Sequence, residues 1–193
     1  MTAMSMSVPA PATRPWLPLL TALSLAGALV VTAFGATAAA TISPRELVPL
    51  LTRSGVGPDW TIIDVIYAPP LFFDATGIPV PDEMDAETTL AFILQETVHD
   101  GELPLEVAEA FLLLTDGTRL EPYEARVTAD DDHHRVSRVL FTRPDDWPAV
   151  IEDDDGMSML RVVVPQRDGS YSVANTFEWV VPIEIGDADA GSQ

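Results

Sequence analysis

The sequence contains no cysteine and no lysine, and only three of its 193 residues are histidine. The missing cysteine excludes disulfides, thiolate catalysis, cysteine-based zinc sites and a lipid-modified cysteine. All ten basic residues are arginines, against 30 aspartates and glutamates, and the formal net charge is -20 at pH 7. Because a chain this negative is repelled by phosphate backbones, nucleic acid is excluded as a partner class.

Motifs of known catalytic machinery are also missing. The chain lacks the GxSxG pattern of a nucleophile elbow. Ser137, His134 and Asp132 have the residue types of a hydrolytic triad, but three such residues within six positions arise easily by chance. Thirty acidic residues offer too many carboxylate pairs for a glycosidase site to be recognised. We therefore predict a protein that is not an enzyme and that requires no cofactor.

One long hydrophobic run lies near the amino terminus. The stretch from Trp16 to Ala40 carries no charge and follows Arg14. As a helix it would span about 30 Å of hydrocarbon, and the arginine places the amino terminus on the cytoplasmic side. Small residues provide cleavage sites near Ala38 and Ala40, so residues 1–40 are either a signal peptide or an uncleaved membrane anchor. Both alternatives place residues 41–193 outside the cytoplasm.

A short helix is expected directly after this run, within a helix-and-linker segment at 41–57. Ser43 fits an N-cap, Pro44 fits the first helical position and Glu46 completes a capping box. Leu47, Leu50 and Leu51 form an apolar stripe, and Gly55 provides a stop.

The remaining sequence predicts a β-rich domain at 58–186. Alternating and β-branched stretches predict strands at 60–70, 88–101, 108–114, 122–129, 134–144, 157–166 and 171–183. The strand at 108–114 is expected to enter a hairpin turn at Asp116-Gly117. Residues 88–101 also fit a helical stripe, and we favour the strand because β-rich stretches flank them. Residues 71–87 carry repeated Pro and Gly and are expected to form a long loop, held to the core by Phe72 and Phe73.

About seven short strands with regular turns are typical of an antiparallel β-sandwich of immunoglobulin-like architecture, although the cysteine pair of true immunoglobulin domains is absent. The fold class is therefore all-β, preceded by the amino-terminal segment and the short helix. In the last strand, alternation places six side chains on one face: Tyr171, Val173, Phe177, Trp179, Val181 and Ile183. Residues 187–193 are expected to be a disordered tail.

The three histidines are candidate metal ligands. His99 ends one expected strand, and His133 and His134 begin another, so all three could meet where strand ends gather. Imidazole binds Cu(II) and Zn(II), and Asp132 with its neighbouring aspartates could orient or complete the shell. Adjacent residues of a strand point to opposite faces, so one of the pair with His99 and a carboxylate is the expected ligand set. The alternative is a solvated polar turn.

Acidic turns raise the question of calcium, which prefers several carboxylate and carbonyl oxygens. The stretches "ADDDHH", "IEDDDG" and "DADAG" are candidates, but none matches the EF-hand loop. Solvated turns are the ordinary alternative in so acidic a chain.

Two aromatic residues are candidate binding contacts. Trp147 lies between Pro144 and Pro148 in an expected loop, and Tyr123 begins an expected strand. An exposed aromatic ring at a rim suits a partner surface, while packing over the open end of the sandwich is the alternative. The sequence thus favours an exported, membrane-tethered binding or accessory module with a protein partner at the outer surface of the membrane. The alternative is an extracytoplasmic copper or zinc protein.

Overall fold

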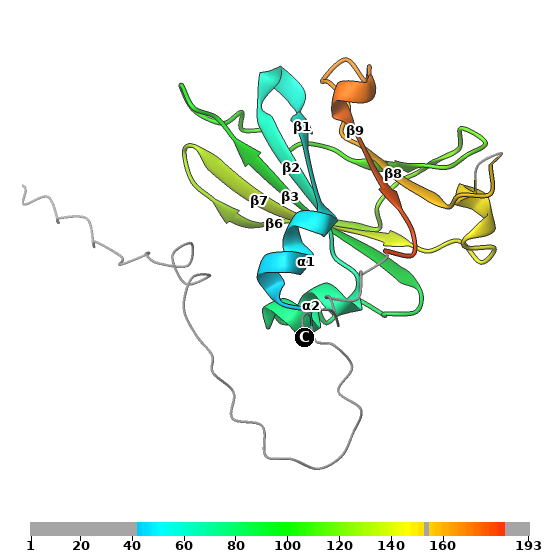
Figure 1. Cartoon of the computed structure of the whole chain (residues 1–193). Coiled ribbons are helices and arrows are strands. Elements are labelled where there is room, and N and C mark those ends of the chain that lie inside the picture. The colour runs from blue at the N-terminus through cyan, green and yellow to red at the C-terminus, as the bar shows by residue number, and fades with distance from the viewer. Residues whose placement is uncertain (1–41, 153–154, 184–193) are drawn as a thin grey trace, which may run out of the picture. The chain divides into compact units, whose positions relative to one another are not determined.

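Within residues 42–152 and 155–183, which the computed structural model describes, the strands form two antiparallel sheets (Figure 1). The first sheet has the order β1-β2-β3-β7-β6 and the second β5-β4-β8-β9. The strands are β1 Thr52–Val56, β2 Ile62–Tyr67, β3 Thr89–Thr97, β4 Phe111–Leu113, β5 Arg119–Leu120, β6 Glu124–Asp130, β7 His134–Thr142, β8 Met159–Val163 and β9 Thr176–Val180. The helices are α1 Pro44–Leu51 and α2 Pro70–Thr76, with short 3₁₀ turns η2 Pro58–Trp60, η3 Ala149–Ile151 and η4 Val173–Asn175.

The two sheets share one hydrophobic core. Alternate residues of β3 (Leu90, Phe92 and Leu94) are buried in one cluster with the inward residues of β8 and β9. Trp179 of β9 is fully buried, with its ring 5.7 Å from that of Phe92. The all-β prediction is therefore confirmed as two antiparallel sheets in a sandwich-like arrangement. The ambiguous segment 88–101 contains a strand, as favoured.

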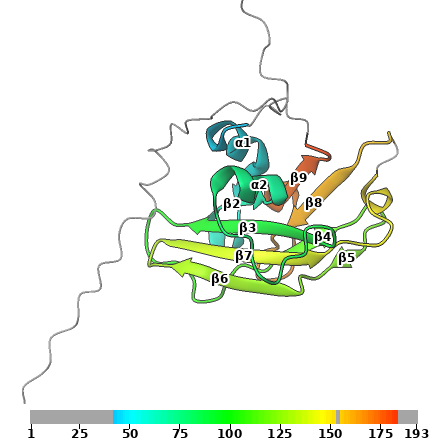
Figure 2. The ribbon, with the colours of Figure 1, turned by 90° about the horizontal axis from the view of Figure 1, so that it is seen from below.

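A second, smaller cluster covers the outer face of the first sheet at one end. Helix α1 contributes Leu47 and Leu51, and α2 contributes Phe72 and Phe73, against Leu140 of β7. Figure 2 shows the two helices together on this side of the sheet, and in Figure 1 they lie opposite the β1–β2 turn. The capping box predicted at Ser43 and Glu46 is present. We call this the helix end of the sandwich.

The expected linker before residue 58 contains a strand. The backbone leaves α1 at Thr52 in an extended conformation, and β1 pairs with β2 from Thr52 opposite Ile66 to Val56 opposite Ile62. The sheet therefore begins at Thr52, six residues before the expected start of the β-rich domain at 58. Tertiary pairing overrides the weak strand propensity of this short, glycine-containing stretch.

The expected loop at 71–87 begins with a helix instead. Pro70 lies in its first turn, and Gly77 ends it with a left-handed φ of 70°. Proline and glycine here are start and stop signals of a helix and not loop residues. The prediction that Phe72 and Phe73 hold this segment to the core is confirmed, because both are buried.

The last expected strand, 171–183, is reduced to the five residues of β9. Ser172 and Asn175 form a capping box around η4, and the Asn175 side chain donates to the carbonyl oxygen of Val164 at 2.8 Å. These local bonds compete with strand pairing. Only Phe177 and Trp179 of the six predicted residues are buried, while Val173 is exposed.

The predicted export segment at 1–40 and the tail at 187–193 lie outside the described residues. Among the residues that are described, no helix is long and apolar enough to cross a membrane.

Candidate functional site

The end of the sandwich opposite the helices gathers four connections. We call it the loop end and define it by residues 57–61, 98–110, 131–133 and 164–175. The segments of the three histidines adjoin here, because the amide of Val98 donates to the carbonyl of His133 at 3.1 Å and Thr97 pairs with His134. The amide of Leu103 likewise donates to the carbonyl of Asp132 at 2.9 Å.

The histidine side chains at this end are exposed. His134 Nδ1 lies 3.2 Å from the hydroxyl of Thr97. The Asp131 carboxylate accepts the backbone N–H groups of His133 and His134 at 2.9 and 2.7 Å, which lowers the pKa of Asp131. Among the described residues, no group of three His, Cys, Asp or Glu is arranged to hold a metal ion. Metal binding by His99, His133, His134 and Asp132 stays a prediction.

The triad of residue types noted in the sequence is not assembled. Ser137 is buried with the inward residues of β7, and His134 is exposed. The two side chains lie three positions apart on one strand and therefore point to opposite faces of the sheet.

A buried ion pair closes the sandwich beneath the loop end. Glu96 of β3 and Arg135 of β7 are register partners, 3% and 4% exposed, with Glu96 Oε2 3.6 Å from Arg135 Nη1. Arg135 also donates to the carbonyl oxygens of Pro104 and Glu106 at 2.8 and 3.2 Å. We call residues 98–110, which connect β3 of the first sheet with β4 of the second, the crossing loop. Arg135 therefore anchors the crossing loop through two of its backbone carbonyls.

Burial raises the pKa of Glu96, and the charge of Arg135 opposes this effect. The folded protein therefore keeps a proton on Glu96 over a pH range in which the unfolded chain has released it. The stability linked to this group is present below the unfolded pKa, near 4.5, and is lost as the pH rises through the folded pKa.

We expect Glu96→Gln, which cannot ionise, to gain stability relative to the wild type over this pH range and to keep a constant difference above it. Urea unfolding of the full chain between about pH 4 and pH 8 measures the difference. Glu109→Gln removes one charge from an exposed residue of the crossing loop and therefore controls for the change in net charge. If the free energy of unfolding changed with pH in the same way for Glu96→Gln and for the wild type, the effect of burial on Glu96 would be contradicted.

Arg167 ties three connections of the loop end together. Its guanidinium forms ion pairs with Asp59 of the β1–β2 turn and with Glu106 of the crossing loop. The neighbouring Gln166 side chain donates to the carbonyl of Gly57 at 3.1 Å. Because the partners come from separate loops, this arrangement fixes how the loops lie beside one another.

Trp60 is displayed at the tip of the β1–β2 turn. The amide of Thr61 donates to the carbonyl of Pro58 at 3.1 Å, and Asp59 and Trp60 between them have φ of 53° and 63°. Two central residues with positive φ define a type I′ turn, whose second central position favours glycine. A bulky residue there costs roughly 1–2 kcal/mol. The indole is nevertheless 88% exposed, so core packing does not explain it.

Two further apolar side chains stand out on the loops that Arg167 and Gln166 connect. Leu105 is 97% exposed and Val173 is 92% exposed. The loop of Val173 lies directly on β1, because a Cβ at Gly55 would come within 2.6 Å of the carbonyl oxygen of Ala174. Trp60, Leu105 and Val173 are called the apolar triplet below.

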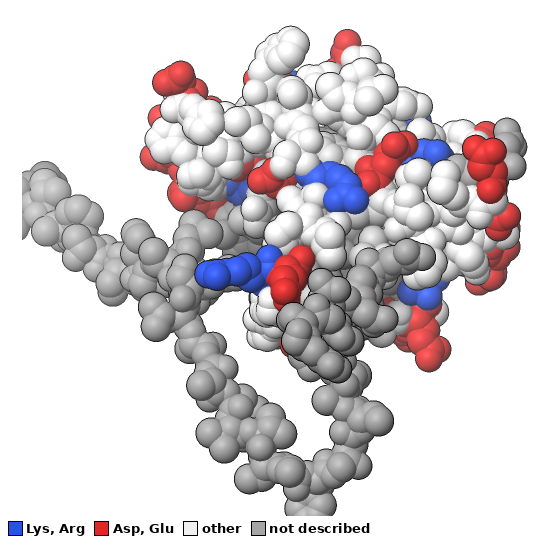
Figure 3. All heavy atoms as spheres, in the orientation of Figure 1, with Lys and Arg blue, Asp and Glu red and all other residues white. Residues whose placement is uncertain are grey.

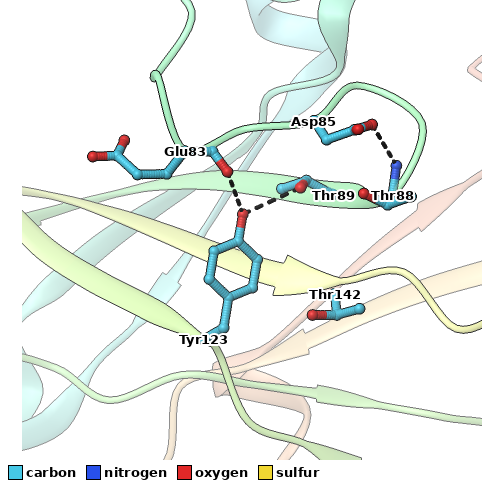
Figure 4. Close-up of a pocket in the computed structure, with 6 residues that line it drawn as sticks. All are labelled: Glu83, Asp85, Thr88, Thr89, Tyr123 and Thr142. Atoms are coloured by element: carbon cyan, nitrogen blue, oxygen red, sulfur yellow. Dashed lines mark hydrogen bonds between the residues drawn. The ribbon is translucent and has the colours of Figure 1, made fainter.

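Tyr123 lies at the helix end, in a shallow open pocket of about 260 Å³ (Figure 4). The pocket is lined by Glu83, Asp85, Thr88, Thr89, Tyr123 and Thr142. The Tyr123 hydroxyl bonds the Glu83 carbonyl and the Thr89 hydroxyl, each at 3.1 Å, so its polar group is engaged within the protein. The half-exposed ring remains available, and a contact role for Tyr123 stays a prediction.

Trp147, the second predicted contact, is partly buried and packs against the shared core. This is the alternative role that the sequence offered. Sequence reasoning gave no contact role to Trp60 and placed it at the start of an expected strand. The signal was present in "GPDW", because a proline-aspartate turn between two strands places the next residue at a turn tip.

Comparison with protein-family models, with curated proteins and with solved structures found no match for this chain.

Proposed function

We propose that this protein is an exported, non-catalytic binding or accessory module, tethered by its amino-terminal segment, that engages a protein partner through the loop end. The observation that carries the proposal is Trp60. Its indole is exposed, and its backbone has a conformation that glycine would adopt at lower cost. A residue that opposes stability and contributes little packing is accounted for by contact with another molecule.

The direction of the chain supports this assignment. The described residues begin at Ile42, beside α1, and the β1–β2 turn, which carries Trp60, lies at the other end of the sandwich (Figure 1). The chain therefore enters the described domain at its helix end, and the loop end lies away from this point of attachment.

We also propose that the likeness to immunoglobulin-like domains is one of architecture and not of strand order. Three consecutive strands, β1, β2 and β3, are neighbours in the first sheet. Immunoglobulin domains instead distribute their strands as ABED and CFG. The metal-binding alternative rests on the meeting of the histidine segments at the loop end, and the geometry of Trp60 favours the binding module over it.

The absence of cysteine allows one experiment to test both export and binding. We would compare Leu105→Cys, in the apolar triplet, with Val80→Cys, an exposed residue of the loop after α2. Each variant carries a single thiol, which a membrane-impermeant maleimide labels in intact cells only if the domain is exported. We expect both sites to react. We also expect the ratio of labelling at 105 to labelling at 80 to be lower in cells than in the purified chain, because the partner covers the loop end.

Failure to label either site in intact cells would contradict export. An unchanged ratio would contradict a partner at the loop end.

A further inference from the structure

Building on the proposed function, we propose that the loop end binds a polypeptide segment that combines apolar with basic side chains. The apolar contacts of the segment would fall on Trp60, Leu105 and Val173. Its basic groups would meet the carboxylates that surround this triplet.

The apolar requirement follows from exposure. Three large apolar side chains on mutually tied loops are each close to nine-tenths exposed or more. The ties through Arg167 and Gln166 are in place without any partner, so the loops need little ordering on binding. Rigid aromatic anchors on a fixed scaffold are the residues that dominate binding energy at interfaces.

The basic requirement follows from charge. The loop end, as defined above, contains eight carboxylates and one arginine. That arginine, Arg167, is already paired with two carboxylates, and the neighbouring Arg135 of β7 is buried. Figure 3 shows more acidic than basic side chains on the face of the molecule that it displays. A segment rich in arginine or lysine complements this surface and is steered toward it.

The same charges disfavour the other occupants of such a surface. A second copy of the chain would bring two strongly acidic surfaces together, each from a molecule of formal charge -20. An anionic lipid surface would be repelled for the same reason. A basic, apolar polypeptide is the occupant that satisfies both the exposed triplet and its carboxylate surroundings.

The test titrates the full chain, in a nonionic detergent, with a labelled synthetic peptide of alternating leucine and lysine, followed by fluorescence anisotropy. Two comparison peptides replace every lysine by glutamate or every leucine by serine. We expect the leucine-lysine peptide to bind more tightly than both. We also expect added NaCl to weaken its binding, because salt screens the carboxylates.

Variants locate the binding surface without changing net charge. We expect Trp60→Gly to weaken binding by about 30-fold, the effect of losing a central aromatic anchor. Its melting temperature should equal or exceed that of the wild type, because glycine suits the turn. A Leu105→Ser/Val173→Ser variant should also bind weakly. An Ile78→Ser/Val80→Ser variant changes exposed apolar residues outside the loop end and should bind normally.

Equal loss of binding in the Ile78→Ser/Val80→Ser control would overturn the proposal by showing that the apolar contact is not specific to the loop end. Full binding by Trp60→Gly would overturn it by showing that the triplet's aromatic anchor is not needed. Equal binding of the glutamate peptide would overturn the basic requirement. Protection of Leu105→Cys in cells together with no peptide binding would refute this partner class and leave the binding module standing. If Leu105→Cys were not protected in cells and the peptide did not bind, both the partner class and the binding module would be refuted.

Discussion

Replacing Arg135 by alanine is expected to lower the free energy of unfolding by about 3–5 kcal/mol, the usual cost of breaking a buried ion pair from one side. The variant leaves Glu96 buried without its cation and removes the donors to the carbonyl oxygens of Pro104 and Glu106. Each buried polar group that loses its partner carries its own desolvation cost. Urea unfolding of the full chain, followed by tryptophan fluorescence, measures the loss.

The structural consequence should be local to the crossing loop. Amide hydrogen exchange at residues 103–108 is expected to accelerate in Arg135→Ala, because this segment loses its anchor while β3 and β7 remain paired. The loop carries Leu105, so binding at the loop end should weaken with it.

A double variant separates the ion pair from the space it fills. Arg135→Met/Glu96→Met replaces both charges by apolar groups and should recover much of the lost stability, because no unpaired charge remains buried. Recovery to near the wild type would assign the cost to the orphaned carboxylate. A double variant as unstable as Arg135→Ala would instead show that the hydrogen bonds to the loop carbonyls dominate.

Replacing Trp179 by alanine is expected to cost about 3–5 kcal/mol through the cavity left in the core. The indole is fully buried and contacts the rings of Phe92 and Tyr67 at centroid distances of 5.7 and 6.2 Å. Its Nε1–H donates to the carbonyl oxygen of Leu51 at 2.8 Å, which links the second sheet to the end of α1. Loss of that bond leaves a buried acceptor unpaired and adds about 1 kcal/mol.

Trp60→Ala is the matched control, because it removes the same side chain from an exposed turn. We expect its midpoint of urea unfolding to stay within experimental error of the wild type or to rise, since exposed substitutions are usually near neutral. Trp179→Phe should fall between the two, because it keeps most of the apolar ring but not the donor. Equal destabilisation by Trp60→Ala and Trp179→Ala would contradict the burial assigned to each residue.

Local patterns in the sequence were sufficient for much of the secondary structure. Alternating and β-branched stretches located β6, β7 and β8, and the capping box located α1, because these signals depend on neighbouring residues alone. The segment of β3 also fitted a helical stripe, and its β-rich flanks decided for the strand. The errors fall where a local signal had two interpretations. The prolines and glycine around Phe72 and Phe73 indicated a loop, but they mark the start and the end of helix α2. Ser172 and Asn175 form a turn inside an expected strand.

The candidate site was only partly predictable. The placement of the segments of His99, His133 and His134 at one end of the sandwich was expected, since strand ends gather at the two ends. The Glu96–Arg135 pair did not follow, because it depends on the register between β3 and β7. The ion pairs of Arg167 with Asp59 and Glu106 join residues that are far apart in the sequence, so no local sequence pattern predicts them.

The sequence by itself determined the acidity, the lack of thiol and lysine chemistry, the all-β class and the expectation of an export segment. These are properties of composition or of short-range periodicity, and folding does not alter them. Only the tertiary structure decided which polar residues are buried and which apolar ones are exposed. Trp179, Trp147 and Trp60 are the same residue type in similar β-rich surroundings, yet one is buried, one partly buried and one displayed. Burial is set by which distant segments pack against a side chain, and pairing register and loop placement fix that only in the folded chain.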